Sequence, residues 1–115
     1  MVDSCIFCKI ANNQARSTIL HQDDQVTAFR DTHPVAPTHV LIIPNKHIRS
    51  LNELQDEDET LLGHMFIVAR QIASTEGIHE GGYRIIMNTG IDGGQSVYHL
   101  HLHLMGGQRM KHPLG

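Results

Sequence analysis

The most informative stretch of this chain is residues 99–104, where histidine and leucine alternate without interruption. In a β-strand, successive side chains point to opposite faces, so this pattern predicts a strand with His99, His101 and His103 on one face. Near neutral pH an imidazole can act as a nucleophile, a proton donor, a proton acceptor or a metal ligand. A solvated strand face with ordinary polar histidines is the alternative. Three imidazoles in a row favour a reactive centre.

A glycine-rich segment, residues 88–96, precedes these histidines and holds three glycines within five positions. Glycine lets backbone N–H groups approach a ligand closely, which is how such loops hold phosphate. The segment lacks the Gly-Lys-Ser/Thr ending of a P-loop, and taken alone it fits a plain hairpin connection better. Because Gln95 and Ser96 lie just before the histidines, we expect loop and imidazoles to face one reacting centre.

Cys5 and Cys8 are separated by two residues, a spacing that lets two thiolates bind one zinc ion. The chain has only these two cysteines, so a tetrahedral zinc site needs two further ligands, for which histidine is the natural source. A reduced pair without metal, a redox dithiol and a disulfide are the alternatives. A redox role lacks the expected βαβ surroundings, and a reducing compartment disfavours a disulfide.

Periodicity and breaker residues predict four strands and two helices to position these groups. The predicted strands are residues 25–30, 39–43, 83–88 and 99–105, and the predicted helices are residues 5–12 and a longer one that starts within the acidic residues 56–59 and stops at Gly77. This order of elements, together with the alternation of polar and apolar side chains along the strands, predicts an α+β fold: an antiparallel sheet with helices packed on one side.

Length and composition predict a single globular domain, residues 1–115, with 40% hydrophobic and 18% charged residues. A formal charge of −3 and no run of Lys or Arg argue against bulk nucleic-acid binding. Residues 1–4 show no basic region followed by an apolar one, and no apolar run reaches membrane-spanning length. We therefore expect a cytoplasmic protein without membrane contact, whose cysteines stay reduced.

The segment from Gly93 to Leu104 resembles the histidine triad superfamily, in particular its purine-nucleoside phosphoramidase branch. The resemblance extends to residues 28–31, 36–44 and 46–48 and covers nearly the whole chain from Cys5. It implies an α+β fold with a central antiparallel sheet, one long helix and a short N-terminal helix. It also implies a homodimer whose two sheets join side by side.

The same resemblance implies an enzyme that cleaves the P–N bond of purine nucleoside 5′-phosphoramidates. His101 resembles the nucleophile that attacks the α-phosphorus to form a nucleotidyl-histidine, which water hydrolyses to AMP or GMP. His103 would contact the phosphate oxygens and His39 would support the histidines from behind. Ser96 is similar to the donor to the leaving group. The nucleotide-binding residues that the resemblance implies are Asp31, Thr32, Asn88, Gly94, Gln95, Ser96, His101 and His103.

Some members of this superfamily carry the cysteine pair and bind zinc. By that resemblance, the metal ligands are Cys5, Cys8, His47 and His99. A closed site with four protein ligands is structural, because no position remains for a reacting water. If His99 binds the metal, it cannot also attack phosphorus.

Several histidines and one carboxylate also have plain structural interpretations. His39 fits a hydrogen-bonded core histidine, and Asp31 fits a turn residue before a proline-containing segment. His21, His64 and His79 match no motif and are interpreted as ordinary surface or helix-flanking residues.

The C-terminal segment, residues 111–115, departs from the pattern of the most similar phosphoramidases. Their chains end with a tryptophan and two prolines that reach the partner subunit's site, whereas this chain has His112 followed by a single proline. The substitution leaves the leaving-group preference open. The alternative functions are hydrolysis of dinucleoside polyphosphates and a non-catalytic nucleotide-binding or interaction module.

Overall fold

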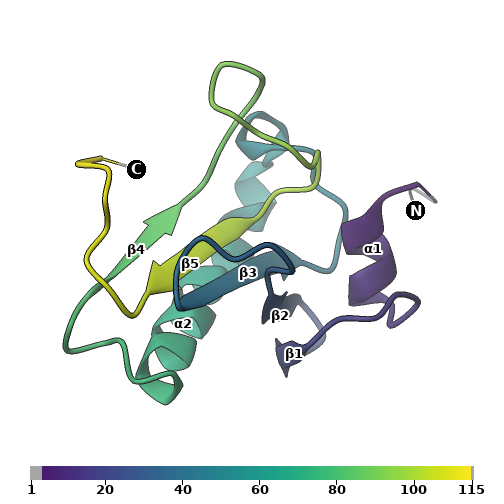
Figure 1. The fold of residues 1–115 in the computed structure, drawn as a ribbon. Helices are drawn as coiled ribbons and strands as arrows, with labels where there is room; N and C mark the ends of the chain where they lie inside the picture. The colour runs from purple at the N-terminus through teal and green to yellow at the C-terminus, as the bar shows by residue number, and fades with distance from the viewer. Residues whose placement is uncertain (1–3, 115) are drawn as a thin grey trace.

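The computed structural model describes residues 4–114, and its centre is a five-stranded antiparallel sheet in the order β1-β2-β3-β5-β4 (Figure 1). The strands are β1 (Ile19–Gln22), β2 (Val26–Arg30), β3 (Thr38–Pro44), β4 (Tyr83–Ile86) and β5 (Leu102–Gly106); the helices are α1 (Ile6–Ala11) and α2 (Glu59–Thr75), with short 3₁₀ turns at Leu51–Glu53 and Asp56–Asp58. The predicted α+β class and the predicted long and short helices are confirmed. The ends of the predicted domain, residues 1–3 and 115, lie outside the described residues.

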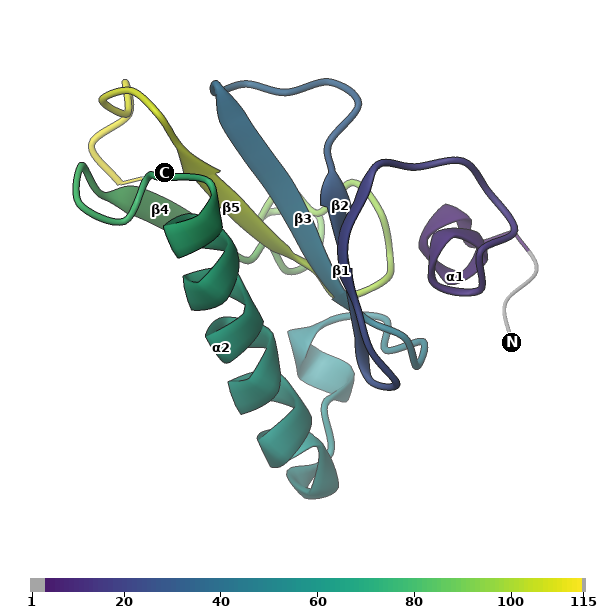
Figure 2. The same ribbon diagram turned by 90° about the horizontal axis from the view of Figure 1, so that it is seen from below.

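The two helices cover opposite faces of the sheet, so the prediction that both pack on one side is wrong (Figure 2). Strand β3 is buried at every position. Its residues Val40 and Ile42 pack in the cluster formed with α2, whereas Leu41 and Ile43 pack in the cluster formed with α1. Because a strand covered on both faces has apolar residues at successive positions, the run 40–43 already carried this signal.

The histidine strand is shorter than predicted, because β5 begins at Leu102 rather than at residue 99. Before that point the backbone makes other bonds: the N–H of Leu100 donates to the carbonyl oxygen of Ile48 at 2.7 Å. The carbonyl oxygen of His99 accepts a hydrogen bond from the ring of His101. The alternation nevertheless keeps the histidines on the α1 side of the sheet, where Phe7 contacts both of these rings.

Strand β1 was not predicted, and its pairing with β2 explains why. The register shifts between Ile19 and His21, so the short strand shows no clean alternation. Helix α2 was predicted well: it begins at Glu59 after the acidic 3₁₀ turn, and Gly77 follows its end with φ +76°. No helix in residues 4–114 combines the length and apolar character needed to cross a bilayer.

Candidate active site and adjoining metal cluster

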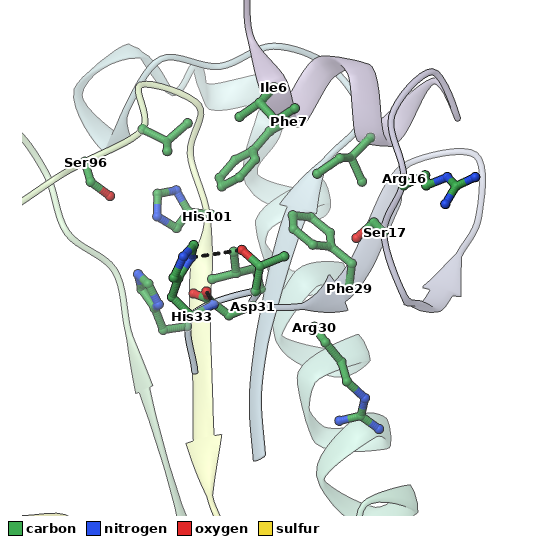
Figure 3. Close-up of a pocket in the computed structure, with 15 residues that line it drawn as sticks. Ile6, Phe7, Arg16, Ser17, Phe29, Arg30, Asp31, His33, Ser96 and His101 are labelled. Carbon is green, nitrogen blue, oxygen red and sulfur yellow. Dashed lines mark hydrogen bonds between the residues drawn. The ribbon is translucent and has the colours of Figure 1, made fainter. Parts of the chain in front are cut away.

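A cavity of about 400 Å³ lies between α1, the start of β5 and the end of β2 (Figure 3). Figure 3 shows Ser96 and His101 on the β5 side, with Phe29 and Asp31 across from them. This volume suits a small-molecule ligand. The lining residues are Ile6, Phe7, Ile10, Arg16, Ser17, Phe29, Arg30, Asp31, Thr32, His33, Leu41, Ser96, Val97, His101 and His103.

His101 is buried, and its hydrogen bond fixes the tautomer of the ring. Its Nδ1 lies 2.7 Å from the carbonyl oxygen of His99. Because a carbonyl oxygen can only accept, Nδ1 carries the hydrogen and Nε2 keeps its lone pair. The ring lines the cavity, with the ring of Phe7 against it in an edge-to-face contact at 5.1 Å. A neutral imidazole held this way is prepared to act as a nucleophile or proton acceptor.

His39 and His103 form a directed chain of hydrogen bonds across the sheet. The backbone N–H of Val35 donates to Nδ1 of His39 at 3.1 Å, so the hydrogen of His39 is on Nε2. That Nε2 lies 2.9 Å from Nδ1 of His103 and donates to it. His103 therefore carries its own hydrogen on Nε2, and it presents an N–H donor to a ligand.

Burial keeps these imidazoles neutral at pH 7. Burial, together with the neighbouring His101 and His39, lowers the pKa of His103 from its ordinary value of 6.5 to about 4. Burial likewise lowers the pKa of His101 and of His39, although the charge of Asp31 opposes both shifts. The site thus combines one unprotonated nitrogen and one N–H donor on adjacent rings, whose centroids are 5.0 Å apart.

Asp31 and Thr32 line the same cavity at the end of β2. The Oδ1 of Asp31 accepts a hydrogen bond from the backbone N–H of His33 at 2.8 Å, as the turn interpretation expects. Its Oδ2 lies 3.4 Å from Nε2 of His39. The carboxylate of Asp31 therefore stabilises the turn through one oxygen and faces the histidines of the site with the other.

The structure does not bring the side chain of Gln95 into the cavity. Its Oε1 accepts from the N–H of Gly90 at 2.9 Å, and its Nε2 donates to the carbonyl oxygens of Arg49 and Val97 at 2.9 and 3.0 Å. The buried amide of Gln95 thus makes all of these hydrogen bonds to backbone groups. It fixes the position of the neighbouring Ser96, which is exposed and lines the cavity.

Asn88 and Gly94 also lie in the glycine loop and are not among the cavity-lining residues. The Nδ2 of Asn88 donates to the carbonyl oxygen of Gly93 at 2.7 Å. A side chain at Gly93 would collide with the backbone of Thr89, and Gly94 has φ +79°. The loop is therefore closed by its own hydrogen bonds, and its glycines are required by its fold.

Cys5, Cys8, His47 and His99 form a compact cluster beside the cavity. Their ligand atoms all lie within 4.8 Å of one another, and Nδ1 of His47 and Nδ1 of His99 are 3.2 Å apart. The Nε2 of His99 donates to the carbonyl oxygen of Pro44 at 2.8 Å, so its Nδ1 faces the thiols with a lone pair. These four residues are positioned to hold a metal ion. Two sulfur and two imidazole ligands form a donor set typical of zinc.

Phe7 connects the cluster to the cavity. It lies between the two cysteines in the first turn of α1, and its ring makes edge contacts with the rings of His99 and Phe29, with centroids 5.9 and 5.4 Å apart. The cysteine cluster therefore adjoins the part of α1 where Phe7 packs against His101.

Four polar cavity residues were missed by the sequence analysis: Arg16, Ser17, Arg30 and His33. Arg16 and Ser17 belong to the connection between α1 and β1, which shows no motif. They reach the cavity only because β1 pairs beside β2. His33 follows Asp31 and Thr32, so its proximity to two predicted residues was the one available signal.

Comparison with known proteins agrees with this geometry. The chain matches the family described as "Scavenger mRNA decapping enzyme C-term binding" over residues 4–113. It is 54% identical over 115 residues to the purine nucleoside phosphoramidase of Escherichia coli (strain K12), an alignment that covers 100% of this chain and 93% of that protein.

Solved structures show the same fold. A HIT family hydrolase from Legionella pneumophila Philadelphia 1 superposes with a TM-score of 0.94 at 48% identity, covering 97% of this chain and 100% of that one. A histidine triad protein from Clostridium difficile gives a TM-score of 0.94 at 43% identity, covering 97% of each chain. The chain belongs to the histidine triad family, and the expectation of an enzyme of this family is confirmed.

Proposed function

We propose that this protein hydrolyses the P–N bond of purine nucleoside 5′-phosphoramidates through a covalent nucleotidyl-His101 intermediate and releases AMP or GMP. The observation that carries the proposal is the tautomer of His101, whose hydrogen bond to the carbonyl oxygen of His99 leaves Nε2 unprotonated in a ring that lines the cavity. The similarity to the E. coli purine nucleoside phosphoramidase supports the substrate class.

In the first step, Nε2 of His101 attacks the α-phosphorus and a P–Nε2 bond forms as the P–N bond to the leaving group breaks. The leaving amine takes the electron pair of that bond together with a proton, for which the exposed hydroxyl of Ser96 is the donor. In the second step, water attacks the same phosphorus, the P–Nε2 bond breaks, one proton of that water restores the hydroxyl of Ser96, and the nucleoside monophosphate leaves. Both steps place extra negative charge on the phosphoryl oxygens.

His103 stabilises that charge through its Nε2–H, and His39 holds His103 in the required tautomer. Asp31 and Thr32 bind the ribose hydroxyls, because a carboxylate and a hydroxyl at the cavity edge suit them. The apolar rings of Phe7 and Phe29 flank the purine. From the glycine loop, Asn88 and Gly94 approach the ribose and phosphate, whereas Gln95 contributes by fixing the loop.

Zinc is proposed as the structural metal of Cys5, Cys8, His47 and His99. When bound, it supplies no reacting water, because four protein ligands complete its coordination. It ties α1 to the segment before β5. The thiolate ligands require a reducing compartment, which supports a cytoplasmic location.

We also propose a homodimer joined through β4. This strand forms one edge of the sheet, and its residues Ile85 and Ile86 are only half-buried in the single chain. An edge with apolar residues is a typical pairing surface. Light scattering coupled to size exclusion measures the mass, and a mass of one chain contradicts this part of the proposal.

The test compares turnover of a fluorogenic adenosine phosphoramidate with turnover of diadenosine polyphosphates. We expect the first to be cleaved in preference, and the His101→Ala variant to lose roughly 10³-fold or more of the activity while it still binds AMP. Mass spectrometry of a reaction quenched and digested at alkaline pH, where a P–N bond to histidine survives, then detects the nucleotidyl adduct on residues 99–103 of the wild type. Preference for the polyphosphate contradicts the substrate, and unchanged turnover in His101→Ala contradicts the mechanism.

A further inference from the structure

A second group of metal-ligating side chains lies at the β1–β2 turn, on the part of the chain where the sequence showed no motif. Nε2 of His21 and Nε2 of His64 lie 2.6 and 2.7 Å from the same oxygen, Oδ2 of Asp23. His21 comes from β1 and His64 comes from the second turn of α2. Three residues from two elements therefore place two nitrogens and one oxygen within 4.8 Å of one another.

The carboxylate at the centre is rigidly held. Its other oxygen, Oδ1, accepts hydrogen bonds from the backbone N–H groups of Gln25 and Val26, both at 2.8 Å. Burial disfavours the charged form, but the hydrogen bonds from the two histidines and the backbone outweigh it and hold the pKa of Asp23 well below its ordinary value. Asp23 is thus a preoriented anion at neutral pH, and its Oδ2 is directed at the imidazoles.

We propose that His21, Asp23 and His64 form a second metal site, which takes a divalent transition-metal ion of the Zn²⁺ type. Two imidazole nitrogens and one carboxylate oxygen are ligands that such ions prefer. The three side chains are each about one third exposed, at 29%, 28% and 34%, so water can complete the coordination. Metal–ligand bonds of about 2.0–2.2 Å require the nitrogens to move only roughly 0.8 Å from Oδ2.

The proton balance of binding follows from the hydrogen bonds. In the metal-free protein each imidazole donates its Nε2–H to Asp23. To ligate through Nε2, each ring must carry its hydrogen on Nδ1, so binding a divalent ion to the neutral rings exchanges tautomers and releases no proton. Acid competes with the metal, because a protonated imidazole has no lone pair to offer.

The site differs from the Cys5/Cys8/His47/His99 cluster in position and chemistry. It lies between the β1–β2 turn and α2, on the sheet face opposite α1. It has no sulfur ligand and it keeps a coordination position open. A bound ion would join the hairpin to the long helix, which the described chain otherwise links there through hydrogen bonds of Asp23.

The experiment titrates Zn²⁺ and Co²⁺ into the full-length protein as isolated, with its bound metal measured beforehand by mass spectrometry. We expect a total of two equivalents per chain in the wild type. The His21→Gln and His64→Gln variants each keep the first equivalent and weaken the second by at least about 100-fold, since even groups that only orient a ligand contribute 10- to 100-fold. The His79→Gln variant removes an exposed histidine elsewhere and keeps both equivalents.

Co²⁺ separates the two sites by its absorption. A Co²⁺ ion bound by the cysteines shows a thiolate charge-transfer band, whereas the ion at the histidine site shows only ligand-field bands. In the double variant Cys5→Ser/Cys8→Ser, which has no thiol left, the histidine site should therefore still bind Co²⁺ without the thiolate band. The proposal is thus tested even if the cysteine cluster holds no zinc. A wild type that binds metal only through the cysteines overturns the proposal, as does a second equivalent that both glutamine variants retain.

Discussion

His39 donates its Nε2–H to Nδ1 of His103 over 2.9 Å, from strand β3 to strand β5. The backbone N–H of Val35 sets the tautomer of the first ring, and the first ring sets that of the second. This series of hydrogen bonds thus ends at the cavity, where His103 presents an N–H donor. A residue that never contacts the substrate can in this way decide which nitrogen of His103 meets a phosphoryl oxygen.

This relationship predicts the effect of removing His39. We expect His39→Ala to lower kcat about 10- to 100-fold with little change in KM, because the partner that orients a functional imidazole contributes this much. His39→Gln should recover part of the loss, since its amide can donate to His103. Steady-state kinetics on the phosphoramidate substrate measure both variants. Equal activity of His39→Ala and wild type would show that His103 is oriented without it.

The pKa of His103 predicts how the stability of the fold depends on pH. Its value of about 4 in the native protein lies below the ordinary 6.5, so between these pH values the unfolded chain binds a proton that the native chain does not. The free energy of unfolding therefore falls as the pH drops through this window. Urea denaturation from pH 7 to pH 4 should give a shallower decline for His103→Gln than for wild type, while His79→Gln should follow the wild type.

Much of the candidate site could be predicted from the sequence because its residues are paired or alternate at short spacing. The alternation of histidine and leucine placed His101 and His103 side by side, and their rings are in contact in the structure. The Cys-x-x-Cys spacing, together with the family resemblance, gathered four residues that the structure brings within reach of one metal ion.

What the sequence did not predict depends on long-range contacts. Strand β5 begins at Leu102 and not at residue 99, because the backbone N–H of Leu100 donates to the carbonyl oxygen of Ile48. No local sequence pattern encodes this contact. The placement of the helices on opposite faces was not predicted because α1 has only six residues, too few for a pattern that shows which face it covers. His21 and His64 are 43 positions apart and meet only through Asp23, so each was interpreted as an ordinary surface histidine.

The geometry of the cysteine cluster predicts that metal binding and stability change together. Cys5 also caps α1, because its Sγ accepts from the N–H of Cys8. Serine is a favoured helix cap but a poor zinc ligand, so Cys5→Ser keeps the cap and loses the metal. We expect the melting temperature to fall by at least about 5 °C and the cluster's zinc to be lost, with most turnover retained. Loss of turnover at unchanged metal content would contradict a structural role.

The position of Ser96 predicts a selective effect on the leaving group. Its exposed hydroxyl lines the cavity on the same side as His101, and Gln95 fixes the loop that carries it (Figure 3). If the hydroxyl supplies the proton to the leaving amine, Ser96→Ala should lower kcat on the order of 100-fold. The loss should shrink for substrates whose leaving groups depart readily without protonation, because the missing proton then matters less.

Ser17 offers a matched control, because it is a hydroxyl of the same cavity on the connection before β1, across from His101. Ser17→Ala should leave kcat near the wild-type value for every leaving group. The diagnostic measurement is kcat against leaving-group pKa for the three proteins, since a proton donor changes the slope of this plot. A Ser96→Ala line parallel to that of wild type would assign Ser96 a role in binding only.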